Sequence, residues 1–104
     1  MITTALCLLV AASHTHWVSP PLGDGAGAMA PSLFGDGKHL HLTWLEPVDP
    51  TSRSGMWRLQ HARWHDGAWT PPTTVATADD FFINWADTPV VCATDDAVLV
   101  TWLK

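Results

Sequence analysis

The sequence has 104 residues, of which 47% are hydrophobic and only 14% are charged, and it contains seven Trp, eight Pro and no Tyr. This composition excludes a disordered tail and a coiled coil, because both need a much larger share of polar and charged residues. The net charge of -5 gives the chain no electrostatic attraction to a nucleic-acid backbone or an anionic membrane surface, so neither is expected as a partner.

The N-terminal segment, 1–16, resembles a secretory signal peptide. An apolar run from Ala5 to Ala12 is followed by small residues, and Val-Ala-Ala at 10–12 is typical of a cleavage site. This run is too short to cross a bilayer as a helix, which takes about 20 residues. The first basic residue is Lys38, so the positively charged start of a signal peptide is missing, and a short buried helix or strand is the alternative. The leader predicts a secreted or periplasmic protein.

Two cysteines, Cys7 and Cys92, are too few for a disulfide framework. Removal of the leader would take Cys7 with it. We therefore predict that Cys92 is a single, buried thiol, since free cysteine behaves as a small apolar residue.

Residues 17–104 predict an all-β fold. Dense Pro and Gly between residues 17 and 31 indicate an extended loop. Beyond it, segments with the two-residue period of strands are separated by turn sequences. The predicted strands are residues 32–34, 38–46, 56–64 and 69–76, with turns at 35–37 and 65–68 and a loop over 47–55. Together they predict an antiparallel, four-stranded meander, whose last strand suits a sheet edge because it contains Pro71 and Pro72.

One sequence pattern occurs twice, at 31–45 and at 89–103, so that Pro31 corresponds to Pro89. Pro, Thr, Trp and Leu recur at equivalent positions, and three further positions stay apolar. A four-stranded meander that repeats at about this interval is typical of a β-propeller, whose blades bury their faces only against one another. We predict about one and a half blades, the first over 31–77 and the start of the second over 88–104. Two similar hairpins in a β-sandwich are the alternative.

Three stretches of the chain resemble bacterial sialidase-like proteins with Asp-box (BNR) repeats. They are the degenerate Asp-box at 63–72, the paired Leu-Thr-Trp-Leu and Val-Thr-Trp-Leu strands, and the segment 80–87. The resemblance implies a six-bladed propeller with an exo-α-sialidase or other sugar-directed function, of which this chain is a fragment. It also implies a structural Asp-box at Asp66, Gly67 and Trp69, in which the carboxylate accepts backbone N–H bonds and the indole packs across the turn. Trp64 stands where a Ser or Thr is usual.

The loop over 79–88 is the candidate functional site. In a propeller, a loop that leads into an innermost strand opens at the ligand-binding face. We predict Asp87 as the catalytic residue and Asn84 and Trp85 as substrate-binding residues, because carboxylate, amide and indole groups bind sugar hydroxyls and sugar rings. In the alternative, Asn84 and Asp87 bond the backbone of their own loop and Trp85 packs between blades.

Catalysis by these residues alone is in doubt. Glycoside hydrolysis uses two carboxylates about 5–9 Å apart, or a Tyr nucleophile in sialidases, and the chain has no Tyr. A sialidase also holds its substrate with clustered arginines. Arg58 and Arg63 lie on one strand and face opposite sides, and Arg53 is in a loop, so they are not expected to converge. The alternative function is a non-catalytic propeller or scaffold module that binds glycans or proteins.

His39 and His41 share one face of a strand and are candidate metal ligands. The repeat has Ala97 and Leu99 at the equivalent positions, which indicates a packing face, so we predict neither a metal nor a cofactor. The expected partner is a glycan or sialoside substrate. Repeat arrays need about three units for a continuous core. Missing blades or self-association are therefore expected to complete the fold, with poor solubility of this piece alone.

Overall fold

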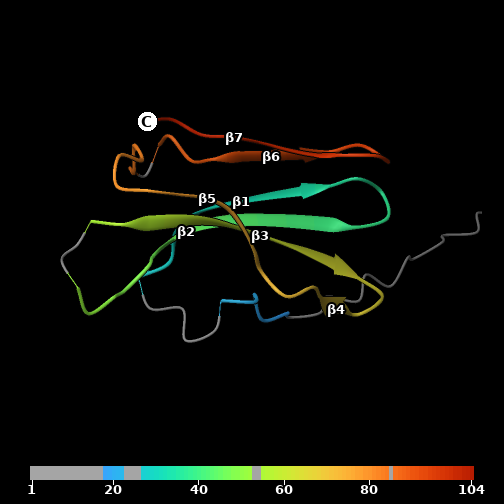
Figure 1. Ribbon diagram of the computed structural model, residues 1–104. Coiled ribbons are helices and arrows are strands. Elements are labelled where there is room, and N and C mark those ends of the chain that lie inside the picture. Colours follow the sequence, from blue (N-terminus) through green and yellow to red (C-terminus); the bar gives the residue numbers. More distant parts are fainter. Residues whose placement is uncertain (1–17, 23–26, 53–54, 85) are drawn as a thin grey trace, which may run out of the picture.

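The computed structural model describes residues 18–22, 27–52, 55–84 and 86–104 (Figure 1). The regular structure in these ranges is antiparallel β-strand, so the predicted all-β class is confirmed. The described residues hold no helix long and apolar enough to cross a membrane. The predicted signal peptide, residues 1–16, lies outside them.

Five strands form one antiparallel sheet. Their bounds are β1 (Met29–Gly35), β2 (Leu40–Pro47), β3 (Trp57–His65), β4 (Ala68–Trp69) and β5 (Thr73–Ala78). The first three pair in chain order, and both β4 and β5 pair with β3. The sheet is thus a meander whose outermost strand is divided in two. Pro71 and Pro72 lie at the division, because proline has no N–H to contribute to a ladder.

Strand β1 begins at Met29, inside the segment that the sequence predicts as a loop. Its pairing with β2 shifts register between Met29 and Ser32, and Ala30 has a φ of 54°. Such a bulge leaves a residue outside the ladder. Pro31 is tolerated in it, so a proline that reads as a strand breaker lies within a strand.

Strands β6 (Val90–Ala93) and β7 (Val98–Thr101) form a second, two-stranded sheet. It repeats the hairpin β1–β2 register for register. Ser32 lies opposite Thr43, and their repeat equivalents, Val90 and Thr101, lie opposite each other in the same way. The next three pairs toward each turn keep this correspondence. The sequence repeat is therefore also a repeat of backbone structure.

The two faces of the large sheet differ in what they contact. We call the face that carries Thr43 and Leu45 the back face, and the face that carries Leu42 and Trp44 the front face. Leu45 and Leu59 lie opposite each other in β2 and β3, and both are buried in a core with Ala30 and Phe81. This core lies between the back face and the hairpin β6–β7 (Figure 1).

The hairpin β6–β7 packs on the large sheet through its own front face. Val100 and Trp102, the repeat equivalents of Leu42 and Trp44, pack against the core of the back face. Trp102 also meets Phe81 edge to face, with ring centroids 6.4 Å apart. The front face of the second unit therefore covers the back face of the first.

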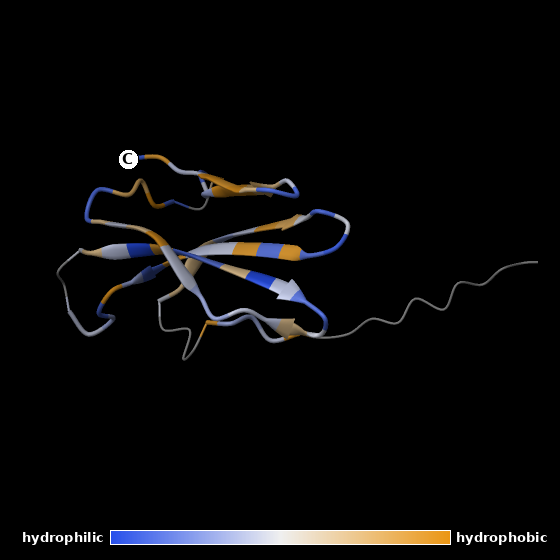
Figure 2. Ribbon diagram, turned by 45° about the vertical axis from the view of Figure 1, so that its right-hand side comes forward, coloured by the Kyte–Doolittle hydropathy of each residue, from blue (hydrophilic) through white to orange (hydrophobic). Residues whose placement is uncertain are grey.

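The strands of the hairpin β6–β7 are largely hydrophobic (Figure 2), and the residues of its back face are exposed. Val90, Leu99 and Leu103 are 56%, 56% and 55% exposed. Cys92 is exposed on the same face, so the prediction of a buried thiol is wrong. The period of two explains the difference: Val91 points into the core, at 2% exposed, and its neighbour must point away.

Candidate functional site

The predicted loop, residues 79–88, is anchored at its start. Phe81 is buried in the core, and the N–H of Phe82 donates to the carbonyl of Leu103 at 3.0 Å. The ammonium of Lys104 lies 3.2 Å from a carboxylate oxygen of Asp80. These contacts fix the loop beside the end of β7, as the connection between the two sheets.

The structure brings Asn84 and Asp87 together. The amide of Asn84 donates to Asp87 Oδ2 at 2.8 Å, and Asn84 Oδ1 accepts the N–H groups of Ala86 and Asp87, each at 2.6 Å. These are the bonds of a loop that caps itself, as in the structural alternative. Trp85 lies outside the described residues.

Asp87 also lines a pocket of about 340 Å³ at the end of β7. The pocket is also lined by the hydroxyl residues Thr88 and Thr101 and by Trp102, whose indole packs on Phe81. Hydroxyl and carboxylate groups are thus gathered in one concavity.

The described arginines do not converge. Arg58 donates from Nε to Glu46 Oε1 at 2.7 Å, and Gln60 and Trp44 donate to the same carboxylate at 3.1 Å. Arg63 lies five residues further along β3, which corresponds to roughly 17 Å of strand. Arg53 lies outside the described residues. No carboxylate-binding arginine cluster is formed by Arg58 and Arg63.

The Asp-box residues form the turn between β3 and β4. Asp66 and Gly67 have φ of 51° and 81°, and they connect the paired residues His65 and Ala68. Positive φ at both positions is the requirement of a two-residue type I′ hairpin turn. The Asp66 carboxylate is exposed, and its Oδ2 lies 3.0 Å from His65 Nε2. Trp69 packs edge to face on the opposite residue of β3, Trp64, with ring centroids 5.5 Å apart.

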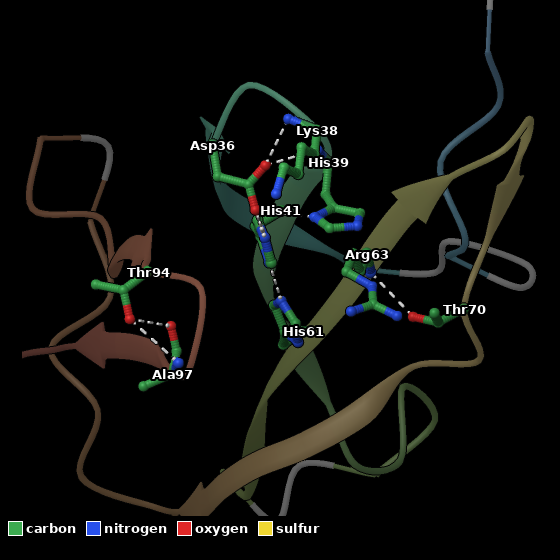
Figure 3. A network of polar contacts seen from close by, with 9 residues as sticks. All are labelled: Asp36, Lys38, His39, His41, His61, Arg63, Thr70, Thr94 and Ala97. Carbon is green, nitrogen blue, oxygen red and sulfur yellow. Dashed lines mark hydrogen bonds and ion pairs between the residues drawn. The ribbon is translucent and has the colours of Figure 1, made fainter.

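A second cluster lies at the turn between β1 and β2, and sequence reasoning did not assemble it. The two carboxylate oxygens of Asp36 have different partners (Figure 3). Its Oδ1 accepts the N–H groups of Lys38, at 2.8 Å, and His39, at 2.6 Å. Its Oδ2 lies 2.9 Å from His39 Nδ1 and 3.2 Å from His41 Nε2. The bond from the His39 ring, followed by the backbone bonds, holds the pKa of Asp36 well below its ordinary range.

His41 continues the cluster into the protein. Its side chain is 3% exposed, and its Nδ1 lies 3.1 Å from His61 Nε2, with the two rings stacked at 5.3 Å between centroids. Burial, and then electrostatic repulsion from His41 and Arg63, lower the pKa of His61. His61 is therefore held in its neutral form, able to accept or donate one bond to His41.

This cluster lines a pocket of about 380 Å³ between the two hairpin turns. Asp36, His39, His41 and Arg63 come from the large sheet and its first turn. The turn between β6 and β7 contributes Thr94, Asp95 and Asp96 from the other side. The repeat brings these two turns together, because the second hairpin packs on the first.

The sequence does carry a signal for part of this cluster. Period-two alternation places His39 and His41 on one face, and Asp36 precedes them in a turn. The register of β2 on β3 cannot be predicted from this pattern. It places His61 opposite Thr43 and diagonally beside His41. That register depends on the long loop between these strands.

The chain was compared with models of protein families, with curated proteins and with solved structures, and nothing matched.

Proposed function

We propose that this chain is part of a β-propeller-like array directed at carbohydrate, and that its described residues bind a glycan. The proposal of an array is supported by the repeat of the hairpin, which keeps the same strand register in both units. The front face of the second unit packs on the back face of the first. Stacking of this kind can continue, because the back face of the second unit is apolar and exposed.

The pocket beside Asp87 supports the choice of a glycan. Sugar hydroxyls bond to carboxylate and hydroxyl groups. Asp87, Thr88 and Thr101 offer these groups in one pocket of about 340 Å³, a size suited to one or two sugar units. The sequence resemblance to sialidase-like proteins points to the same class of ligand.

Binding is favoured over hydrolysis. The chain has no Tyr to act as the sialidase nucleophile, and Arg58 and Arg63 lie at different ends of β3. The Asp87 carboxylate accepts the amide of Asn84 and is exposed to solvent, with no second carboxylate among the residues that line its pocket. We therefore propose a glycan-binding module. The alternative function is a scaffold that binds protein.

The test is a titration of the full chain with 3′-sialyllactose and with lactose, followed by saturation-transfer NMR. We expect saturable binding that Asp87→Ala weakens at least fivefold. Asp49→Ala, a change at an exposed turn aspartate outside the pocket, should leave binding unchanged. The proposal is wrong if neither sugar binds, or if both variants bind as the wild type does. If the chain released the aglycone from a fluorogenic sialoside, its function would be hydrolysis and not binding alone.

A further inference from the structure

The cluster at the β1–β2 turn has the composition of a metal site. From the geometry of its side chains we infer that Asp36, His39 and His41 bind a divalent transition-metal ion of the zinc type. Imidazole nitrogen with one carboxylate oxygen is a donor set that zinc and its neighbours in the first transition row accept, whereas calcium and magnesium prefer oxygen alone.

The ligand atoms are spaced for a small ion. Asp36 Oδ2 lies 2.9 Å from His39 Nδ1 and 3.2 Å from His41 Nε2, and the three ligand atoms lie within 4.8 Å of one another. In a tetrahedral site with zinc–ligand distances of about 2.0–2.1 Å, neighbouring ligand atoms are roughly 3.3 Å apart. Two of the three separations already approach that value, and the third is at most 4.8 Å.

Two of these ligands are held in place by the protein. Asp36 Oδ1 accepts two backbone N–H groups of the turn, which fixes the carboxylate and leaves Oδ2 for the ion. Nδ1 of His41 lies 3.1 Å from His61 Nε2. When Nδ1–H donates to His61, Nε2 of His41 is left free to bind a metal, and a second group behind a metal-binding histidine commonly has this role.

The second hairpin serves as an internal comparison for the first. Thr94, Ala97 and Leu99 are the repeat equivalents of the three ligands, and the same turn forms there with Thr94 Oγ1 accepting the N–H of Ala97 at 3.2 Å. The backbone turn thus needs neither histidine. The fold therefore does not require two imidazoles to converge on one carboxylate oxygen, whereas a bound cation does.

The surroundings leave one side of the site open. It faces the pocket of about 380 Å³, where Asp95 and Asp96 lie across from the histidines. With Asp36 they place three carboxylates against the cations Lys38 and Arg63, a balance that favours a divalent ion. Three protein ligands with an open position are typical of zinc sites that accept water or a further ligand, unlike closed structural sites.

The second hairpin also supplies the variants for the test. Asp36→Thr, His39→Ala and His41→Leu each introduce the residue that the repeat already contains at the equivalent position. The experiment is calorimetric titration of the full chain with Zn²⁺ in a buffer that does not bind metal, with Mg²⁺ and Ca²⁺ as comparisons. We expect one saturable site for Zn²⁺, at least tenfold weaker in each variant, and no comparable site for the other two ions.

Two controls separate this site from other ligands of the chain. Asp49→Asn changes an aspartate that caps a different turn, where Asp49 Oδ1 accepts the N–H of Thr51 at 2.9 Å, and it should keep full affinity. A His14→Ala/His16→Ala variant, which removes the two histidines outside the described residues, should also keep it.

Absence of one-to-one Zn²⁺ binding in the wild type would overturn the inference, as would loss of the site in the His14→Ala/His16→Ala variant. Undiminished binding by His39→Ala would do the same, and that variant decides the matter if His41→Leu fails to fold, because the His39 side chain is 22% exposed. Circular dichroism of each variant records whether the sheet is kept. The outcome does not depend on glycan binding at Asp87.

Discussion

Asp36 and Thr94 hold equivalent positions in the hairpin turns of the two repeated units. The N–H of Asp36 donates to the carbonyl of His39 at 3.1 Å, and that of Thr94 to the carbonyl of Ala97 at 2.8 Å. In each turn the side chain also accepts a backbone N–H, through Asp36 Oδ1 and through Thr94 Oγ1. Both turns thus have a side-chain acceptor at this position, a carboxylate in the first and a hydroxyl in the second.

This equivalence predicts how the first turn tolerates change. Asp36→Thr should keep the melting temperature of the metal-free chain close to that of the wild type, because threonine can accept the same N–H. Asp36→Ala removes the acceptor and should lower the melting temperature by a few degrees. Thermal unfolding followed by circular dichroism in the presence of EDTA measures both. Equal losses in the two variants would show that the carboxylate, and not the capping bond, stabilises the turn.

The exposed back face of the second unit predicts self-association. Val90 and Leu99, each 56% exposed, lie on an apolar surface whose equivalent in the first unit is covered. A second copy of the chain can cover it, so sedimentation velocity should detect dimers or larger species at micromolar concentration. Leu99→Lys should shift the distribution toward monomer, because it places a charge in the contact. Val48→Lys, at a 42% exposed position on a loop, is the matched control and should not. A wild-type chain that stays monomeric contradicts this prediction.

Much of the fold follows from patterns that act over a few residues. Alternating side chains predicted β2 and β3 nearly within their observed limits, and the Asp66-Gly67 pair predicted a tight turn. Two features were missed for physical reasons. The bulge at Ala30 allows a strand to continue through Pro31, and the exposure of Cys92 depends on which face of its strand meets the large sheet. Neither can be deduced from residue type alone.

The site was harder to predict than the fold. Asn84 and Asp87 are close in sequence, and the structure joins them through bonds of only local range. The cluster combines Asp36 and His39 with His41 of β2 and His61 of β3. The contact between His41 and His61 depends on the register of these two strands. The repeat argued against a ligand role for His41, because Leu99 is its equivalent. The structure places His41 in a polar cluster, whereas its equivalent Leu99 lies on an exposed apolar face.

The neutral form of His61 predicts a loss of stability in mild acid. Because the folded state lowers its pKa from the ordinary 6.5, the unfolded chain binds the proton more readily. The stability is therefore complete above pH 6.5 and declines as the pH falls from 6.5 to the lower pKa of the folded chain. His41 and Arg63 are the charged or titratable neighbours that oppose protonation, after burial.

Urea unfolding of the metal-free chain at pH 7.5, 6.5 and 5.5, in EDTA, measures this dependence. His61→Gln should flatten the decline in the free energy of unfolding. His65→Gln changes a histidine whose side chain is 46% exposed, and it should keep the wild-type dependence. A decline that is the same in all three proteins would assign acid sensitivity to other groups.

Thr43 predicts a stabilising substitution. The residue is fully buried, and its hydroxyl has no hydrogen-bond partner among the described residues. An unsatisfied buried hydroxyl costs about 1–3 kcal/mol, and valine has nearly the same shape and an equal preference for strands. Thr43→Val should therefore raise the free energy of unfolding by about 1 kcal/mol. Its repeat equivalent provides the control: Thr101 is exposed, so Thr101→Val should change stability by less than about 0.5 kcal/mol. Urea unfolding of both variants checks the pair, and destabilisation by Thr43→Val would mean that the hydroxyl is bonded in solution.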